Sequence, residues 1–272
     1  MKPAKNHLKI RPKKSLGQNY LVDDNIGKKI AGIFNINRDD KILEIGPGNG
    51  EITRHILNYT ENITAIELDI NNFNKLKENF PGLNVINADF LTVDLDEILN
   101  SFDISKNEKL RIIGNIPYNI SSDILFKLAG NHNIIRDAQL MMQEELAQRI
   151  VAVPSTKDYS RLSIMIQIFS APELLFKVSR SCFYPKPNVD SRIIHFDFEK
   201  NRLDEINNIG FLGKFVKTAF MSRRKMLRHT MNAYNIDIKT DLPEFDFTRR
   251  IESFSISEII SLCNKLSSII HR

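Results

Sequence analysis

The sequence predicts an α/β fold with a mostly parallel sheet and an antiparallel edge, followed by a small all-helical domain. Three observations predict it. Apolar runs and amphipathic stretches alternate from about residue 38 to residue 200, as they do where helices join parallel strands. The last two apolar runs of that region, 173–183 and 191–198, fit an antiparallel closing pair. Beyond about residue 200 the apolar residues recur only with helical period.

The individual elements follow in order along the chain. Short apolar runs predict five parallel strands over 41–46, 63–69, 83–90, 110–118 and 138–143. Amphipathic stretches predict the connecting helices over 51–59, 70–80, 121–130 and 144–153. Ser121 or Ser122 is placed to cap the third of these helices. We therefore expect a basic N-terminal arm (1–14), an α/β domain (15–200) and a helical C-terminal domain (201–272).

Basic residues are concentrated in two places, although the formal net charge of the chain is only +5. The first fourteen residues contain six Lys and Arg residues and no acidic residue. A second cluster is Arg223-Arg224-Lys225, with Arg228 one helical turn further on. Such clusters suit a polyanion such as RNA. Solubilising surface charge explains them equally well.

Several other classes of protein are disfavoured. No apolar stretch approaches the roughly 20 residues that span a bilayer, and the charged N-terminus does not have the pattern of a secretory signal. Cys182 and Cys263 are isolated, so neither a zinc site nor a disulfide framework is indicated. We therefore expect a cytoplasmic protein, without a metal and without a membrane partner.

A glycine-rich run, Gly-Pro-Gly-Asn-Gly from Gly46 to Gly50, lies at the first strand-to-helix junction. Glycines allow a tight turn and let a ligand approach the backbone. The run is shorter than the dinucleotide fingerprint, and this contraction is usual for S-adenosylmethionine, which has no pyrophosphate. Glu67 and Asp89 end the next two predicted strands, where they can accept from ribose hydroxyls and an adenine amino group. Taken singly, the loop could be a plain turn and the acids surface residues.

The four residues from Asn115 to Tyr118 end the fourth predicted strand, at the same edge as the glycine run. Asn and Pro are common in turns, and the four letters alone favour a turn slightly. A second interpretation is a clamp for an exocyclic amine. The Asn115 side-chain oxygen and the Ile116 carbonyl would each accept one N–H, Pro117 would hold Ile116 extended, and Tyr118 would stack on the base. The position at the cofactor edge favours this clamp.

Seven segments resemble the ribosomal RNA adenine N6-dimethyltransferases, and they occur in the order found in that family. They are KKSLGQNYLVD, EIGPGNG, AIELD, ADF, GNIPYNISS, KDYSRLSIMIQ and CFYPKPNVDS. The resemblance extends from about Lys13 to Arg228. It implies a Rossmann-like methyltransferase fold with S-adenosylmethionine as cofactor.

The resemblance also implies a role for individual residues. The positions that match cofactor-binding positions of the family are Gln18, Asn19, Leu21, Gly46, Gly48, Glu67, Asp89 and Asn115. Those that match its target-base positions are Asn115, Ile116, Pro117, Tyr118 and Phe183. Phe183 would sandwich a flipped adenine against the tyrosine, whereas without the resemblance it would be assigned to the core. Tyr20 departs from the family, which usually has Phe there.

The helical segment 215–231 resembles the branch of the family that acts on the small ribosomal subunit. That branch dimethylates two adjacent adenosines in the 3′-terminal hairpin loop of small-subunit rRNA, so the expected partner is this rRNA or the assembling subunit. The expected RNA contacts are Lys13, Lys14, Arg223, Arg224, Lys225 and Arg228. We expect a monomer.

Three alternatives remain beside this interpretation. The same fold could serve an assembly or transcription factor that binds RNA without turnover, although the intact motifs argue against a purely non-catalytic protein. A related family member could act on large-subunit rRNA. An NAD-dependent oxidoreductase is disfavoured by the contracted glycine run and by the scattered positions of His55, His195 and His229.

Overall fold

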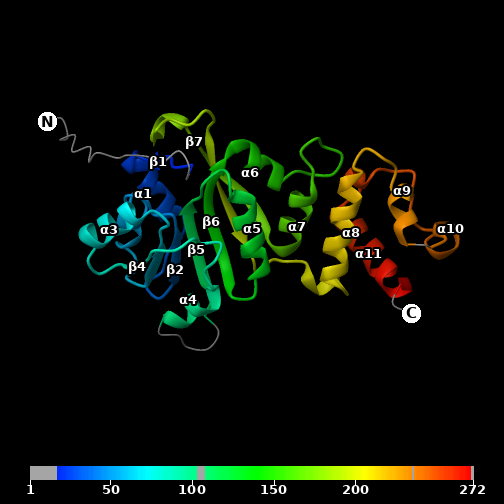
Figure 1. Cartoon of the computed structure of the whole chain (residues 1–272), viewed down its shortest axis with the longest axis horizontal. Helices are drawn as coiled ribbons and strands as arrows, with labels where there is room; N and C mark the ends of the chain where they lie inside the picture. Colours follow the sequence, from blue (N-terminus) through cyan, green and yellow to red (C-terminus); the bar gives the residue numbers. More distant parts are fainter. Residues whose placement is uncertain (1–16, 103–107, 235, 271–272) are drawn as a thin grey trace.

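The computed structural model describes residues 17–102, 108–234 and 236–270. The predicted N-terminal arm, including Lys13 and Lys14, lies outside these ranges. Figure 1 shows a sheet with helices packed on it and, at the end of the molecule opposite α3 (Ile70–Asn79), the C-terminal helices.

Within the described residues, one main sheet has seven strands. These are β2 (Lys41–Ile45), β3 (Ile63–Ile66), β4 (Asn84–Ile86), β5 (Leu110–Asn115), β6 (Ile135–Gln143), β7 (Ala171–Val178) and β9 (Ser191–Asp197). Their order across the sheet is β4-β3-β2-β5-β6-β9-β7. The first five in this order are parallel, and β9 is antiparallel to both β6 and β7. The predicted mixed α/β sheet is therefore confirmed.

The helices alternate with the strands in the first part of the chain and follow one another in the last part. Those that pack on the sheet are α1 (Asp24–Ile33), α2 (Thr53–Ile56), α3, α4 (Leu95–Ser101), α5 (Ser121–Gly130), α6 (Glu144–Ile150) and α7 (Arg161–Phe169). The C-terminal region contains α8 (Ile209–Met221), α9 (Arg228–Met231), α10 (Ile238–Asp241), the short η5 (Ile251–Ser253) and α11 (Ile256–Ile270). A separate two-stranded sheet pairs β1 (Tyr20–Leu21) with β8 (Phe183–Tyr184).

Alternate residues along the strands point to opposite faces of the sheet and pack into two hydrophobic cores, one on each face. Leu43 and Ile112 pack with apolar residues of α4, α5 and α7 on one face. Ile42 and Ile113 pack with residues of α1, α2 and α3 on the other face. A third core lies among the C-terminal helices and includes residues of α7 as well, so α7 contributes to two cores.

Two predicted elements are shorter than their apolar patterns suggested. β4 ends at Ile86, because the next residue, Asn87, turns its side-chain amide onto the carbonyls of Glu67 and Leu68. Asp89 therefore lies in the loop after the strand. The predicted helix 51–59 forms a regular helix only over α2, and the buried Thr53 donates its hydroxyl to Glu44 at 2.6 Å.

The prediction that Ser121 or Ser122 caps α5 is wrong. The N-cap residue is Ile120, and no side chain bonds to the free N–H groups of the first turn. Ser121 is already helical and almost fully buried, and its hydroxyl donates to the carbonyl of Pro117 at 2.8 Å. A serine inside the first turn can reach back to a preceding carbonyl, which removes it from the capping position.

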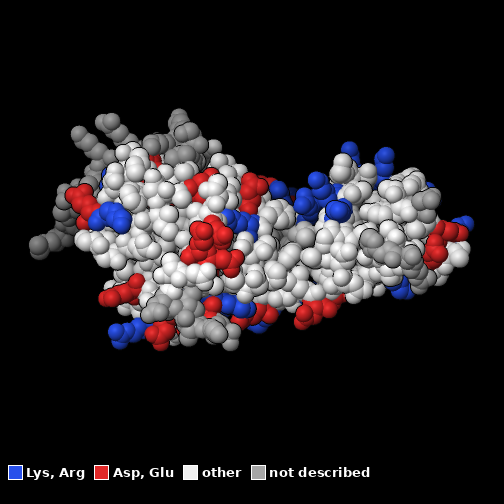
Figure 2. All heavy atoms as spheres, turned by 60° about the horizontal axis from the view of Figure 1, so that its bottom comes forward, with Lys and Arg blue, Asp and Glu red and all other residues white. Residues whose placement is uncertain are grey.

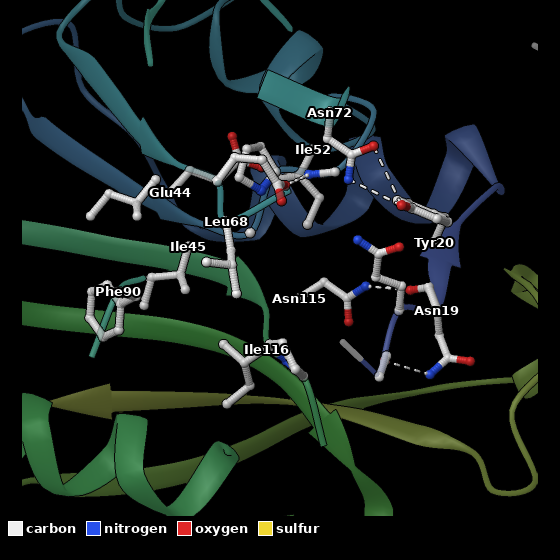
Figure 3. A pocket seen from close by; sticks show the side chains of 18 of the residues that line it. Asn19, Tyr20, Glu44, Ile45, Ile52, Leu68, Asn72, Phe90, Asn115 and Ile116 are labelled. Carbon is white, nitrogen blue, oxygen red and sulfur yellow. Dashed lines mark hydrogen bonds between the residues drawn. The ribbon is translucent and has the colours of Figure 1, made fainter. Parts of the chain in front are cut away.

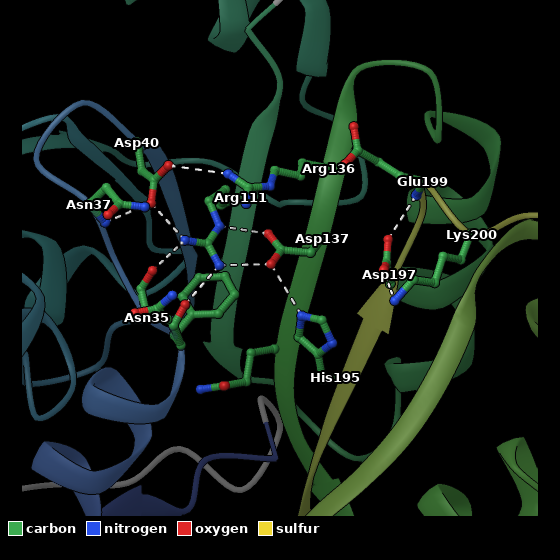
Figure 4. Close-up of polar contacts among 12 residues, drawn as sticks. Asn35, Asn37, Asp40, Arg111, Arg136, Asp137, His195, Asp197, Glu199 and Lys200 are labelled. Carbon is green, nitrogen blue, oxygen red and sulfur yellow. Dashed lines mark hydrogen bonds and ion pairs between the residues drawn. The ribbon is translucent and has the colours of Figure 1, made fainter.

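A charged network joins elements at the edge of the sheet where the parallel strands begin (Figure 4). The Arg111 guanidinium on β5 donates to both carboxylate oxygens of Asp137 on β6, at 2.8 and 2.7 Å. It also donates to Asp40 at 2.6 Å and to the carbonyl of Phe34, which caps the end of α1, at 2.7 Å. His195 on β9 contacts the same Asp137. One arginine thus connects a helix end with two strands, and Asp137 extends the network to a third.

Candidate active site

The candidate site lies where the order of strands reverses. From β2 the chain continues to β3 on one side and later enters β5 on the other side. In doubly wound sheets such a switch point opens a crevice at the carboxyl ends of the strands. Ile45 is paired with Gly114, so the glycine run after β2 and Asn115 at the end of β5 are neighbours. A Cβ at Gly114 would lie 2.5 Å from the carbonyl oxygen of Ile45, so only glycine permits this approach.

A pocket opens at this switch point and is lined by every predicted cofactor residue (Figure 3). The predicted residues that line it are Gln18, Asn19, Leu21, Gly46, Gly48, Glu67, Asp89, Asn115, Ile116, Pro117 and Tyr118. Apolar side chains such as Ile45, Leu68 and Phe90 form much of the remaining wall. A few polar groups on apolar walls are typical of a small-molecule site.

The glycine run forms a tight loop with positive φ angles. The φ angles of Gly46 and Gly48 are 63° and 61°, a region that other residues rarely adopt. A Cβ at Gly48 would also lie 3.0 Å from the ring of Tyr20. Glycine here therefore meets both a conformational and a steric requirement.

Glu67 follows β3 and is held by the backbone around it. Its carboxylate accepts from the N–H groups of Gly48 at 3.0 Å and Asp69 at 2.8 Å. Burial raises the pKa of Glu67, and these two hydrogen bonds lower it in part. The glycine loop and the predicted ribose-binding acid are thus one connected unit. Asp89 is less buried and accepts from the N–H of Leu91 at 2.9 Å, which orients it in its loop.

Residues 17–21, which we call the N-terminal strap, cross the pocket and are tied to it at three points. The side chain of Gln18 donates to Asp69 at 3.1 Å. The hydroxyl of Tyr20 meets the buried side chain of Asn72, with Nδ2 3.1 Å away. The carbonyl of Asn19 accepts from the Asn115 side chain at 3.0 Å. Asn72 could not be predicted as a site residue, because its only signal in the sequence is its position in the amphipathic pattern of α3.

The contact with the strap determines the orientation of the Asn115 amide. Because the carbonyl of Asn19 can only accept, the side-chain atom that faces it must be Nδ2. Oδ1 therefore points to the other side of the amide. The following residues are also held, since the N–H of Ile116 donates to Met141 at 3.1 Å and Ser121 donates to the Pro117 carbonyl. The Asn-Ile-Pro-Tyr stretch is the beginning of a turn and part of the pocket wall at once.

Tyr118 and Phe183 differ in their surroundings. Tyr118 is half-buried, lines the pocket, and contacts the buried Ser191 through its hydroxyl at 2.8 Å. Burial raises the pKa of Tyr118. Phe183 is 3% exposed and is absent from the pocket wall. The pairing of β8 with β1 places it in the core with Leu21 and Ile193. Phe183 therefore does not line the pocket, and its predicted stacking on a target base stays a prediction.

Two further pocket residues were missed in the sequence. Glu44 on β2 is 1% exposed, and burial raises its pKa to about 8. Asn49 belongs to the glycine run, and within the described residues its side-chain nitrogen and oxygen are buried without a hydrogen-bond partner. Buried polar atoms normally have partners. A ligand with both an acceptor and a donor beside the glycine loop, such as the amino-acid end of S-adenosylmethionine, fits this part of the pocket.

Of the predicted RNA-binding residues that the structure describes, Arg223, Arg224 and Lys225 lie at the junction between α7 and the C-terminal helices, and Arg228 begins α9. Figure 2 shows Lys and Arg side chains gathered over this junction. Arg224, Lys225 and Arg228 are exposed. Arg223 is different, because its guanidinium pairs with Glu252 and donates to the carbonyls of Thr156 and Lys157. The expected helix across this cluster is interrupted after Met221, where Met226 and Leu227 pair with Arg250 and Arg249 instead.

The described residues contain neither a candidate membrane span nor a candidate metal site. No helix there is long and apolar enough to cross a membrane. No group of three or more His, Cys, Asp or Glu side chains is arranged to hold a metal ion in the part of the chain that the structure covers.

The fold and the site define an rRNA methyltransferase, and the chain belongs to the ribosomal RNA adenine dimethylase family, whose model matches residues 9–267. The methyl donor of this family is S-adenosylmethionine. The ribosomal RNA small subunit methyltransferase A of Francisella tularensis subsp. novicida is 38% identical over 265 residues, which cover 95% of this chain and 99% of that protein.

Two solved structures share the fold. A dimethyladenosine transferase from Plasmodium falciparum superposes with a TM-score of 0.72 at 24% identity, over 92% of this chain and 97% of the other. The 23S rRNA methyltransferase ErmE superposes with a TM-score of 0.64 at 25% identity, over 91% of this chain and 99% of the other.

Proposed function

We propose that this enzyme dimethylates N6 of two adjacent adenosines in the 3′-terminal hairpin loop of small-subunit rRNA. The observation that carries the proposal is the orientation of Asn115, whose Nδ2 is engaged by the strap while Oδ1 remains for a substrate. The name and near-complete coverage of the Francisella relative support the small subunit as the target. We further propose that it acts as a monomer in the cytoplasm, where the small subunit assembles.

The pocket offers matching groups for each part of S-adenosylmethionine. Glu67, held by two backbone N–H groups, would accept from the ribose hydroxyls. Asp89 would accept from the adenine amino group. Gln18, Asn49 and the glycine loop would surround the amino-acid end. When bound, the cofactor supplies an electrophilic methyl group on its sulfur.

The clamp formed by Asn115 and Ile116 would act on the adenine amine. The lone pair of that nitrogen is delocalised into the ring, which makes it a poor nucleophile. Two acceptors, Asn115 Oδ1 and the Ile116 carbonyl, would take one N–H each and favour the geometry in which the lone pair is localised. The methylated nitrogen is acidic and loses its proton to water, so no strong base is required. Catalysis then consists of positioning and electrostatic stabilisation.

Tyr118 would stack on the target base, which contributes on the order of 1–3 kcal/mol in other systems. Its hydroxyl is engaged with Ser191, which orients the ring. An unpaired adenosine in a hairpin loop costs less to extrude into such a pocket than a paired one. Arg224, Lys225 and Arg228 would contact the rRNA backbone, as would Lys13 and Lys14 in the N-terminal arm.

The test replaces Asn115 with Ala. We expect methyl transfer to small ribosomal subunits to fall by about 100-fold or more, as for other donors or acceptors in preorganised sites. The cofactor dissociation constant, measured by calorimetry, should change only a few-fold. The exposed Asn58 provides the control variant Asn58→Ala, which should retain full activity.

Mapping the modified nucleotides distinguishes the alternatives. The proposal predicts dimethyladenosine at two adjacent positions of the small-subunit rRNA, detected by mass spectrometry. Modification of large-subunit rRNA would assign the enzyme to the other branch. Full activity of Asn115→Ala would remove the role given to this residue. Binding to the subunit without any methyl transfer would identify an assembly factor.

A further inference from the structure

The segment between α6 and α7, residues 151–160, is held by the C-terminal region. The N–H of Ser155 donates to the carbonyl of Glu252 in η5 at 2.8 Å. Tyr159 is fully buried in the third core, and its hydroxyl donates to the carbonyl of Phe254 at 3.1 Å. The conformation of this segment therefore depends on contacts with residues about 100 positions further along the chain.

Arg223 completes this attachment. Its Nε donates to the carboxylate of Glu252, which also holds Ser155 through its backbone. One of its terminal nitrogens donates to the carbonyls of Thr156 at 3.1 Å and Lys157 at 2.8 Å. A single planar guanidinium thus connects the end of α8, η5 and the 151–160 segment. The planar, rigid arrangement of N–H groups in arginine suits these three acceptors, and a lysine ammonium lacks this arrangement.

The two basic neighbours of Arg223 are not used in this way. Arg224 and Lys225 are exposed, and neither side chain forms a hydrogen bond or ion pair with the rest of the described structure. Adjacent residues of the same basic cluster thus differ, since one is directed into the protein and two are directed into solvent.

Arg223 and Lys157 also lie at the border of two adjacent hollows. Both residues line the hollow beside α7 and the hollow beside the end of α8. The other basic residues that line one or the other are Arg149, Arg161, Arg224, Lys225 and Arg250. The surface is the basic junction seen in Figure 2. The backbone that Arg223 holds is the backbone that carries Lys157 into the middle of this surface.

We infer that Arg223 is a positioning residue, which holds the Lys157 segment in place, whereas Arg224 and Lys225 contact the RNA backbone directly. This inference rests on the proposed function, in that the basic surface binds rRNA. Arg223 acts by keeping Lys157 aligned with the basic residues that line the two hollows on either side of it. Its charge is paired with the carboxylate of Glu252, and its side chain is 32% exposed.

The first experiment measures binding to small ribosomal subunits that lack the dimethyladenosines, as a function of salt concentration. A plot of log K against log salt has a negative slope, and each lost phosphate contact makes this slope less steep by about 0.7–0.9. Arg224→Gln should show this loss. Arg223→Gln should show a loss of about the same size, because it displaces Lys157 from its phosphate. Arg223→Lys should behave like Arg223→Gln, because lysine retains the charge but not the fork. Restoration of wild-type binding by lysine would overturn the inference.

A second variant, at Glu252, distinguishes a positioning role of Arg223 from direct binding of phosphate by Arg223. Glu252→Gln removes a negative charge from the basic surface and releases the guanidinium of Arg223. If Arg223 were a phosphate ligand, this variant would bind the subunit more tightly than the wild type. A positioning role predicts weaker binding, because the Lys157 segment loses its anchor.

Hydrogen exchange of the free protein tests the inference independently of RNA. The amides of Ser155 and Tyr159 should exchange faster in Arg223→Lys and Arg223→Gln, and at the wild-type rate in Arg224→Lys. Unchanged exchange in both Arg223 variants would refute the positioning role. If the wild type failed to bind the subunit at all, the proposed function would fail, and the exchange rates would still decide the role of Arg223.

Discussion

Tyr20 shows how a single hydroxyl can hold the strap over the pocket. Its ring covers Gly48, and its hydroxyl meets the buried Asn72 of α3. Burial raises the pKa of Tyr20, so the hydroxyl keeps its proton, and it accepts a hydrogen bond from Asn72 Nδ2 at 3.1 Å. A phenylalanine at this position, which the resemblance implies for the family, could not make this contact.

We predict that Tyr20→Phe loosens the strap. Leaving the Asn72 amide without its partner should lower the free energy of unfolding by about 1–3 kcal/mol. The amides of residues 17–21 should exchange faster, and the cofactor should bind more weakly. Calorimetry and hydrogen exchange measure these effects. Tyr59→Phe, at a 42% exposed position, is the control and should change neither quantity. Equal strap exchange in Tyr20→Phe and the wild type would contradict the prediction.

The buried carboxyl group of Glu44 makes the stability of the protein depend on pH. Its pKa is raised from 4.5 to about 8, chiefly by burial. Between these values the unfolded chain has lost the proton and the folded protein retains it. This contribution to stability is therefore complete below pH 4.5 and is lost as the pH rises towards about 8.

We predict that Glu44→Gln removes this part of the pH dependence. Because one proton is involved, the wild type should lose stability relative to the variant by about 1.4 kcal/mol per pH unit within that window. Urea unfolding of both proteins across the window measures the difference. The exposed Glu78 provides the control Glu78→Gln. Parallel stability curves for Glu44→Gln and the wild type would show that Glu44 is ionised in the folded protein.

At the scale of elements, α5 and the loop before it act as one unit. Ser121 is the first residue of α5, and its hydroxyl holds the Pro117 carbonyl inside the proposed amine clamp. The neighbouring Ser122 is exposed, and its side chain forms no hydrogen bond with other described residues. The pair offers a matched comparison within a single helical turn.

We predict that Ser121→Ala lowers both stability and activity. Loss of the hydrogen bond should cost about 1 kcal/mol of unfolding free energy, and the rate of methyl transfer should fall several-fold because the clamp is less well positioned. Ser122→Ala should leave both unchanged. Thermal unfolding and single-turnover methyl transfer give the two quantities. Equal effects of the two substitutions would assign Ser121 no part in positioning the clamp.

At the scale of the whole molecule, the charged network and the pocket occupy opposite edges of the sheet. Arg111 and Asp137 lie near the beginning of β5 and β6, whereas the pocket lies at the ends of the parallel strands. Burial would raise the pKa of Asp137, but the hydrogen bonds from Arg111 and His195 outweigh it and lower the pKa. The network thus stabilises the sheet without touching the site.

We predict that Arg111→Lys lowers the stability of the fold without weakening cofactor binding. A lysine keeps the charge but cannot reach two carboxylates and a helix-end carbonyl at once, and losing hydrogen bonds to charged groups costs about 1.5–3 kcal/mol. Urea unfolding should show this loss, while the cofactor dissociation constant at low temperature should stay close to that of the wild type. Arg136→Lys, at a partly exposed position, should have little effect. A normal stability for Arg111→Lys would show that the network contributes little.

Local patterns along the chain predicted much of the fold and the site. Short apolar runs located the strands and helical repeats located the helices, because burial imposes these patterns directly on the sequence. The glycine run, Glu67, Asp89 and Asn115 could be predicted for the same reason, since each lies at or shortly after the end of a strand that its apolar run predicts. All of them line one pocket.

The sequence by itself determined the α/β class, the order of the elements and the residue types that gather at the strand ends. Only the tertiary structure decided which of them face the pocket. It directed Tyr118 to the pocket and Phe183 to the core, used Ser121 as a hydrogen-bond donor to Pro117, and paired Arg223 with Glu252. The physical reason is that these outcomes depend on partners far away in the chain, which only the packing of strands and helices brings within hydrogen-bond distance.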